Sequence, residues 1–300
     1  MTDMETGMRI TEEMVFSLLP PRRSDSHKGD YGTLLALCGS RCYRGAAILS
    51  CGGALRSGAG IVCLGSVEEV VSAAVVSHPE LTLLPLPADA EGGIDTERCA
   101  GQILGRLERS DACLAGCGMG NTPATASLTR MLLGEARCPL VLDADALNAL
   151  SRMSDRDELL RLRSCPTVLT PHVGEMARLS GERIADIKAS PAAIAARYAE
   201  KWGCTLVLKD AVTHIADASG RVWRGEVGNA GMARGGSGDV LAGIIASLLA
   251  QGRDASDAAV CGVYLHGAAG DECASRLSMS GMLPSDLLGG LCAVFARNQR

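Results

Sequence analysis

Six short apolar runs, each followed by a turn and then by a segment of helical periodicity, constrain the fold of this 300-residue chain most strongly. Continuous apolar runs of this kind are typical of strands buried on both faces, as in parallel sheets that helices cover. The expected strands lie within residues 33–40, 61–66, 112–116, 139–144, 167–171 and 205–210. The sequence therefore predicts an α/β fold with a mostly parallel central sheet and helices on both faces.

The rest of the chain adds a hairpin and a set of closing helices to this pattern. Residues 213–225 read as a hairpin that turns at Ser219 and Gly220. From Val240 onward the apolar residues follow a helical period, and two or three helices are expected to close the chain. Because the sequence contains neither an internal repeat nor a Pro/Ser-rich linker, we expect a single domain over residues 1–300, with residues 1–25 as a lead-in.

Charge and cysteine usage exclude several classes of function. The net charge is −5 and no Lys/Arg block occurs, so the chain lacks the clustered positive charge that binding to nucleic acid requires. The 13 cysteines are scattered without a C-x-x-C pair, which favours small buried side chains in a reducing compartment over a zinc site. The longest charge-free apolar run, Val240–Ala250, is too short to cross a bilayer. We therefore expect a cytoplasmic protein that binds neither nucleic acid nor a membrane.

The most informative stretch for function is "NAGMARGGSGDVLAG", residues 229–243, in which four glycines surround a serine. A helix is expected to begin here, and the free amides and dipole at a helix N-terminus favour an anion. Asp239 stands at the same place and can be read either as a helix cap or as a base. An anion hole formed by Gly236, Ser237 and Gly238 beside a carboxylate is suited to phosphoryl transfer onto a hydroxyl.

Further polar residues follow the expected strands, where ligands bind in open α/β sheets. Lys209 can meet a phosphate there, or it can be an ordinary solvated lysine. His172 follows a strand and a proline turn, and it can reach a ligand or serve the local structure. Asp143 and Asp145 can bind Mg²⁺ directly or through water, or they can cap the following helix.

Residues 228–243 resemble the signature of the ADP-dependent NAD(P)H-hydrate dehydratases, a family of the ribokinase-like superfamily. Segments similar to that family follow in order from His27 to Asp271: "HKGDYG", "YRGAAILS", "LRSGAG", "GCGMG", "LDADALN", "LTPHVGE", "LKDAVTHIA" and "YLHGAAGD". The resemblance implies a ribokinase-like fold and repair of NADH or NADPH whose nicotinamide ring is hydrated. In that reaction ADP phosphorylates the hydroxyl of the (6S) hydrate, phosphate is eliminated, and AMP remains.

The same resemblance implies roles for individual residues, with Asp239 as the base. It places the nucleotide at Lys209, Asp210, Ala211, Val212, Thr213 and Gly238. It places the hydrated dinucleotide at Ala47, Gly118, His172 and Asp239. This chain departs from the family pattern at Asp210, where glycine is usual, and at Cys117, where proline is frequent.

The resemblance also implies a cofactor and partners. Mg²⁺ is the expected cofactor, ADP is the expected phosphoryl donor, and a homotetramer is the expected assembly. Only some 25 residues precede "SHKGDYG", which leaves no room for the epimerase domain fused to some relatives. Epimerase activity is therefore expected from a separate protein.

Two other functions compete with the dehydratase interpretation. The first is an ATP-dependent kinase of the same fold that phosphorylates a vitamin or a sugar alcohol, because it would use the same anion hole and aspartate. The segments "HKGDYG", "TPHVGE" and "NAGMARGG" together favour the dehydratase over that kinase. The second is a nucleotide sensor without catalysis. Asp239 argues against the sensor, because a pure binding protein gains nothing from a carboxylate beside phosphates.

Overall fold

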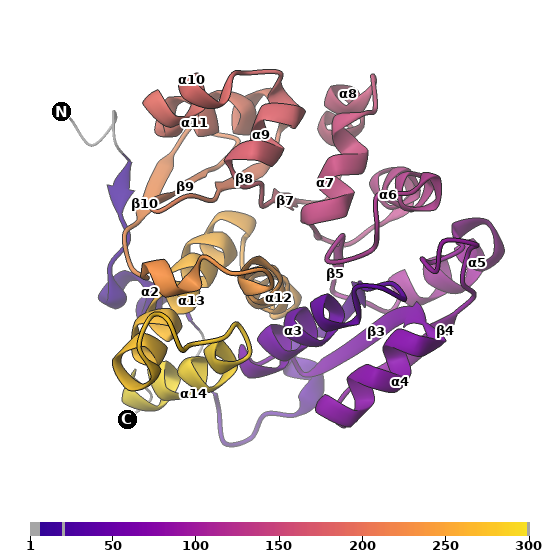
Figure 1. The fold of residues 1–300 in the computed structure, drawn as a ribbon, viewed down its shortest axis with the longest axis horizontal. Helices are drawn as coiled ribbons and strands as arrows, with labels where there is room; N and C mark the ends of the chain where they lie inside the picture. Colours follow the sequence, from indigo (N-terminus) through magenta and orange to yellow (C-terminus); the bar gives the residue numbers. More distant parts are fainter. Residues whose placement is uncertain (1–6, 20–21, 299–300) are drawn as a thin grey trace.

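The computed structural model describes residues 7–19 and 22–298. Within these residues, ten strands form one sheet in the order β1-β10-β9-β8-β7-β6-β5-β2-β3-β4 (Figure 1). The strands are β1 (Met8–Arg9), β2 (Thr33–Leu37), β3 (Ile61–Val67), β4 (Thr82–Leu86), β5 (Ala112–Ala115), β6 (Leu140–Leu142), β7 (Thr167–Leu169), β8 (Thr205–Leu208), β9 (Thr213–Ala216) and β10 (Val222–Gly225). Every neighbouring pair is parallel except the two pairs that contain β9. The prediction of a mostly parallel sheet is confirmed.

The hairpin predicted within residues 213–225 is formed by β9 and β10, which pair antiparallel. Its turn is held by Asp217, whose Oδ1 accepts hydrogen bonds from the amides of Ser219 and Arg221. Gly220 has a φ of +84°, a conformation that favours glycine. The predicted turning point at Ser219 and Gly220 is therefore confirmed.

All six predicted strands are present, but β1 and β4 were not expected. The β4 strand lies at the edge of the sheet and contains Pro85, a residue that usually argues against a strand and is tolerated at edges. The β1 strand has only two residues and pairs with β10. Together with α2 (Glu12–Leu18), it brings part of the expected lead-in into the fold.

Helices cover both faces of the sheet, as predicted (Figure 1). One face carries α2, α3 (Arg44–Arg56), α4 (Glu68–Ser77), α12 (Ser237–Ala250), α13 (Ala255–Leu277) and α14 (Asp286–Asn298). The other face carries α5 (Thr96–Leu107), α6 (Pro123–Glu135), α7 (Ala144–Ser151), α8 (Arg156–Arg161), α9 (Val173–Ser180), α10 (Ile184–Ala189) and α11 (Pro191–Trp202). In the described part of the chain, none of these helices has the length and apolar character needed to span a membrane.

The helix α12 is the central element of its layer, and every residue from Val240 to Ala250 is buried. It packs against α3 and α13 and against the strands β5 and β6. Two glycines allow the approach to α3, because a Cβ on Gly53 would lie 2.5 Å from the carbonyl oxygen of Val240, and one on Gly243 would lie 1.9 Å from that of Ser50. This packing fixes the position at which the Gly-rich turn meets the sheet.

Most of the cysteines are buried, and all 13 are free thiols. Cys42 and Cys292 are exposed and Cys165 is partly exposed. The buried thiols serve as small core side chains, in line with the expectation from their scattered positions.

Candidate active site

A cavity of about 850 Å³ lies where the carboxyl ends of β6, β7 and β8 face the N-terminus of α12. This is the location at which open α/β sheets bind ligands. Its lining contains most of the predicted site residues: His172, Lys209, Asp210, Ala211, Thr213, Gly236, Ser237, Gly238 and Asp239. Three others, Ala47, Gly118 and Val212, lie outside this lining.

The Gly-rich turn leaves the N-terminus of α12 open toward the cavity. The N-cap residue is Gly236, with a φ of +106°, and no side chain caps the helix. The amide of Ser237 donates to the carbonyl of Arg234 at 3.3 Å. Among the described residues, the amides of Gly236, Gly238 and Asp239 have no hydrogen-bond acceptor. The helix therefore offers three amides to a ligand. The predicted anion hole had the amide of Ser237 in place of that of Asp239.

A partly buried histidine, His266, supports the turn from behind. His266 Nε2 lies 2.9 Å from the carbonyl oxygen of Ser237. Burial lowers the pKa of His266 to about 4, so the ring is neutral at pH 7 and donates its N–H to that carbonyl. This contact holds the first turn of α12 in place without adding a charge next to the cavity.

The carboxylate of Asp239 does not cap its own helix. It accepts no hydrogen bond from any amide or hydroxyl of the described residues. Burial and, after it, the charge of Asp143 raise the pKa of Asp239 to about 7, although the Cys117 thiol and Lys209 act in the opposite direction. A carboxyl group with a pKa near neutrality is well matched to proton transfer at cellular pH. The capping interpretation of Asp239 is thus wrong.

An ion pair lies beneath the turn. Lys209 Nζ donates to Asp143 Oδ1 at 2.7 Å, and the Thr170 hydroxyl donates to the same oxygen at 2.7 Å. The Asp143 side chain is 2% exposed and that of Lys209 19%. Burial lowers the pKa of Lys209, but the negative charges of Asp143 and Glu175 together have the larger effect, so the pKa is raised overall. A Cβ on Gly238 would lie 3.3 Å from Nζ, so the ammonium sits directly against the turn.

The two aspartates after β6 have different surroundings. Asp143 occupies the N-cap position of α7 without making a capping hydrogen bond. Asp145 accepts a hydrogen bond from the amide of Gly120 at 2.8 Å. In the parts of the chain that the structure describes, one group of three side chains could hold a metal ion, and it consists of Cys117, Asp143 and Asp239. The structure thus brings Asp143, but not Asp145, into that group.

His172 has a structural role at the rim of the cavity. It is the N-cap of α9, and its Nδ1 accepts hydrogen bonds from the amides of Gly174 and Glu175. Glu175 Oε2 in turn accepts from the amide of His172 at 2.8 Å, which completes a capping box. The His172 side chain remains 54% exposed and lines the cavity, and its Nε2 lies 3.5 Å from Glu175 Oε1.

Glu175 is a site residue that the sequence reasoning missed. It lines the cavity while only 6% exposed, and burial raises its pKa to about 7. A signal for it was present, because an acid three residues after a helix-starting polar residue is the pattern of a capping box. The loop from Val227 to Gly235 was also not assigned, and Asp271 anchors it through the amide of Gly228 and the side chain of Asn229.

Of the remaining predicted positions, Ala47 and Gly118 lie outside the cavity lining and Asp210 lies within it. Ala47 is fully buried in α3. Gly118 has a φ of +63°, and a Cβ there would lie 2.6 Å from that of Ala46. Asp210 is exposed, and its carboxylate accepts a hydrogen bond from the amide of Ala211 rather than forming an ion pair with a described residue.

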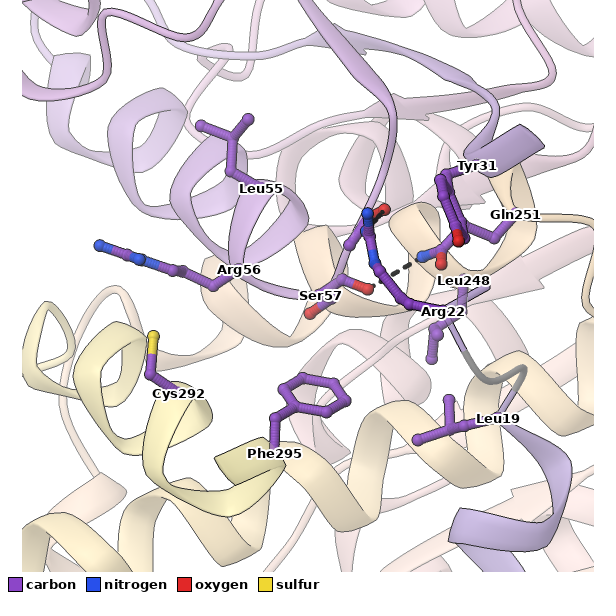
Figure 2. A pocket seen from close by; sticks show the side chains of 11 residues that line it. Leu19, Arg22, Tyr31, Leu55, Arg56, Ser57, Leu248, Gln251, Cys292 and Phe295 are labelled. Atoms are coloured by element: carbon purple, nitrogen blue, oxygen red, sulfur yellow. Dashed lines mark hydrogen bonds between the residues drawn. The ribbon is translucent and has the colours of Figure 1, made fainter. Parts of the chain in front are cut away.

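A second, smaller cavity of about 270 Å³ lies at the C-terminal ends of α3 and α12 (Figure 2). The Gln251 amide donates to the carbonyl of Ser57 at 2.9 Å. The Arg22 guanidinium lies 3.9 Å from the ring centroid of Tyr31 and donates to the carbonyl of Gly58. These polar groups are satisfied by the protein itself, and none of the predicted site residues lines this cavity.

Comparisons with known proteins agree with this geometry. Residues 34–291 match the family model described as NAD(P)H-hydrate dehydratase. The bifunctional NAD(P)H-hydrate repair enzyme of Moorella thermoacetica is 42% identical over 279 residues, which cover 93% of this chain and 52% of that protein. The ADP-dependent (S)-NAD(P)H-hydrate dehydratase of Neisseria meningitidis is 38% identical over 92% of this chain and 87% of that protein. This chain thus spans about half the length of its bifunctional relatives.

Solved structures extend the comparison to the fold. The ADP/ATP-dependent NAD(P)H-hydrate dehydratase of Bacillus subtilis, co-crystallised with ATP and Mg²⁺, matches with a TM-score of 0.83 and 32% identity. The match covers 97% of this chain and 99% of that one. Structural neighbours include ribokinase-like proteins, which confirms the predicted fold class. By its sequence and its fold, the chain belongs to the NAD(P)H-hydrate dehydratase family.

Proposed function

We propose that this protein catalyses the ADP-dependent dehydration of (6S)-NAD(P)H hydrate to NAD(P)H, with AMP and phosphate as the other products. The observation that carries the proposal is the uncapped N-terminus of α12, with the free carboxylate of Asp239 beside unpaired amides and above the Lys209 ammonium. The Neisseria relative, which shares nearly the whole chain, is named for this activity.

The first half of the reaction transfers the terminal phosphoryl group of ADP to the substrate hydroxyl. The amides of Gly236, Gly238 and Asp239 are free to stabilise charge on that group. Lys209 has one N–H engaged by Asp143 and therefore keeps two donors for phosphate oxygens. The ion pair also fixes the position of the ammonium, so it need not be ordered when the nucleotide binds.

Asp239 acts as the base in this step. Its carboxylate accepts the hydroxyl proton while the hydroxyl oxygen bonds to phosphorus and AMP leaves. Its freedom from helix capping leaves the lone pairs available, and its pKa of about 7 lets it take and release a proton near neutrality. Elimination of phosphate together with a ring proton then restores the dihydronicotinamide.

The side chains present fit Mg²⁺ bound together with the nucleotide. Mg²⁺ prefers oxygen ligands and usually takes one or two carboxylates with phosphates and water. Asp143 lines the cavity and would be this ligand through the oxygen that Lys209 and Thr170 leave free, while Asp239 keeps its lone pairs for the substrate proton. When bound, the ion would neutralise phosphate charge. The Bacillus structure that contains ATP and Mg²⁺ supports this cofactor.

We further propose that the nucleotide lies along Lys209, Asp210, Ala211, Val212 and Thr213, with its phosphates at Gly238. Four of those five residues line the cavity, which supports the assignment. The hydrated ring would reach Asp239 from the side of His172. The assignments of Ala47 and Gly118 stay predictions, since both positions admit little side-chain volume and neither lines the cavity.

The proposal extends to partners and location. A homotetramer in the cytoplasm is the assembly we propose, and the free thiols of the described core support a reducing compartment. The matched segment accounts for about half of each bifunctional repair enzyme. We therefore propose that the chain works together with an NAD(P)H-hydrate epimerase.

The test is recovery of dihydronicotinamide absorbance from hydrated NADH and hydrated NADPH, with Mg²⁺ and either ADP or ATP. Recovery with ADP, and AMP as the nucleotide product, is the expected result. Absence of recovery with both nucleotides, together with phosphorylation of an unrelated alcohol by ATP, would instead establish the kinase. Nucleotide binding without turnover of any substrate would establish the sensor.

A further inference from the structure

Three potential metal ligands of two chemical kinds converge beside the cavity, which Asp143 and Asp239 line while Cys117 is buried behind them. The Cys117 sulfur and one carboxylate oxygen each from Asp143 and Asp239 lie within 4.8 Å of one another. Cys117 follows β5 and Asp143 follows β6, so two neighbouring strands deliver these groups to the start of α12. The set therefore joins a thiol to two hard oxygen ligands.

Asp143 is oriented so that one of its oxygens faces the thiol. Its Oδ1 is engaged by Lys209 and Thr170, while its Oδ2 lies 3.9 Å from Cys117 Sγ. Contacts of this kind to the far oxygen are what orient a ligating carboxylate in known metal sites. Oδ2 is thus held in a fixed direction, and among the described residues its one hydrogen-bond donor is the weak Cys117 thiol.

The distance between Cys117 Sγ and Asp143 Oδ2 is close to that expected around a tetrahedral metal ion. Bonds of about 2.3 Å to sulfur and 2.0 Å to oxygen at a tetrahedral angle place the two ligand atoms about 3.5 Å apart. The observed 3.9 Å between Cys117 Sγ and Asp143 Oδ2 needs only a small inward shift. Asp143 and Asp239 line the cavity, so the ion can enter there and a water or phosphate oxygen can complete the coordination.

Charge and ligand softness select the ion. A thiolate and two carboxylates carry three negative charges, and Lys209 offsets one of them, so a divalent cation leaves the group neutral. Mg²⁺ selects oxygen and gains nothing from the sulfur, whereas Zn²⁺ and other thiophilic cations bind thiolate strongly. The presence of Cys117 therefore favours a cation other than the one expected with the nucleotide.

We propose that Cys117, Asp143 and Asp239 form a binding site for a thiophilic divalent cation, with Zn²⁺ as its occupant. On binding, the Cys117 thiol releases its proton to solvent and its sulfur bonds to the metal. The metal also takes a lone pair of Asp239. A consequence that rests on the proposed function is that Zn²⁺ inhibits the enzyme, because Asp239 can no longer accept the substrate proton.

The test uses the purified full chain and Co²⁺ as a spectroscopic substitute for Zn²⁺. We expect about one Co²⁺ per chain, with a sulfur-to-cobalt charge-transfer band that Zn²⁺ abolishes. Cys117→Ser should remove the band and weaken Zn²⁺ binding by about tenfold or more, since even loss of an outer contact to a ligand costs 10–100-fold. The matched control replaces Cys42, Cys165 and Cys292, the thiols that are not buried, with serine. This triple variant should keep both the band and the affinity.

Three results would overturn the site: no band in the wild-type chain, a band that survives in Cys117→Ser, or a band lost in the triple variant. Thermal unfolding of each variant, and Cys117→Ala as a second replacement, separate loss of the ligand from loss of the fold. Neither ADP nor the hydrate enters this assay, so its outcome does not depend on the dehydratase activity. If Zn²⁺ binds as described but a confirmed dehydratase keeps its rate, the inhibition alone is wrong.

Discussion

The helices α9 and α12 both begin at the same cavity, yet their first turns are built in opposite ways. Each carries an acid as its third residue, Glu175 in α9 and Asp239 in α12. In α9 the acid reaches back to the His172 amide, and the His172 ring caps two amides in return. In α12 the N-cap is a glycine, and the acid makes no such contact.

This contrast shows that an acid at the third position of a helix can have either a structural or a chemical role. In α9 the amides of Gly174 and Glu175 already have an acceptor in the His172 ring, so these amides need no ligand. The α12 terminus has left its amides and its carboxylate open, and an open terminus gains most from an anion. Burial raises the pKa of both acids to about 7, so the perturbed pKa alone does not tell the two roles apart. The hydrogen bonds distinguish them, because Glu175 accepts one from the His172 amide and Asp239 makes no such contact.

The sharpest test of the contrast replaces each acid by its amide. Asp239→Asn should lower turnover roughly 10²–10⁴-fold while nucleotide still binds, because the amide cannot accept the proton. Glu175→Gln should cost less than about tenfold, because glutamine also completes a capping box. Steady-state rates for both variants, with thermal unfolding as the control, decide the matter. An Asp239→Asn enzyme that keeps its rate would contradict the role of Asp239 as the base.

The next test concerns the ion pair beneath α12. Lys209→Ala leaves the Asp143 carboxylate buried without its partner, which should cost about 3–5 kcal/mol in the free energy of unfolding. It should also weaken ADP binding. Lys201 provides the matched control, because its pair with Asp157 is exposed and its removal should cost less than about 1 kcal/mol.

A double variant checks the reason for that loss. Lys209→Ala combined with Asp143→Asn removes the unpaired charge and should recover part of the stability measured by urea unfolding. ADP affinity should stay low in the double variant, because the ammonium is still missing. Equal stability of Lys209→Ala and Lys201→Ala would show that the pair contributes no more than a surface contact.

Much of this fold follows from local sequence patterns, because buried parallel strands need continuous apolar runs. The six central strands and the hairpin were predicted for that reason, whereas the edge strand β4 was not, since Pro85 and its exposed positions hide the pattern. The opening turn of α12 was likewise predicted, because glycines before an apolar helix have a local signature.

The partners of each site residue could not be predicted in the same way. Lys209 and Asp143 are 66 residues apart, and their contact depends on β6, β7 and β8 being neighbours in the sheet. The approach of Cys117 to Asp239 depends in addition on the packing of α12 against β5 and β6. Strand order and helix packing are properties of the whole fold, so no single motif encodes these contacts.

A smaller effect should appear in the pH dependence of stability. The folded pKa of Asp239 lies at about 7, above its ordinary value of 3.8, so the folded chain holds this proton more tightly than the unfolded chain. The free energy of unfolding should therefore decrease as pH rises from about 4 to 7. Asp239→Asn removes this contribution, so the variant should gain stability relative to wild type between pH 5 and pH 8. Urea unfolding of both proteins at pH 5 and pH 8 measures this change. If the difference in free energy of unfolding between variant and wild type is the same at both pH values, the raised pKa is contradicted.

The smallest expected effect concerns the capped helix, and it decides what His172 does. His172→Ala removes the cap of α9 and should cost about 0.5–2 kcal/mol, whereas His172→Asn supplies another capping side chain and should cost only a few tenths. If the ring serves α9 alone, His172→Asn will keep the KM for the hydrate as well as the stability. If the imidazole ring also binds substrate, KM will rise in both variants, although only alanine weakens the fold. A rise in KM for His172→Asn with unchanged stability would then mean that His172 has two roles. It would both cap α9 and contact the substrate in the cavity.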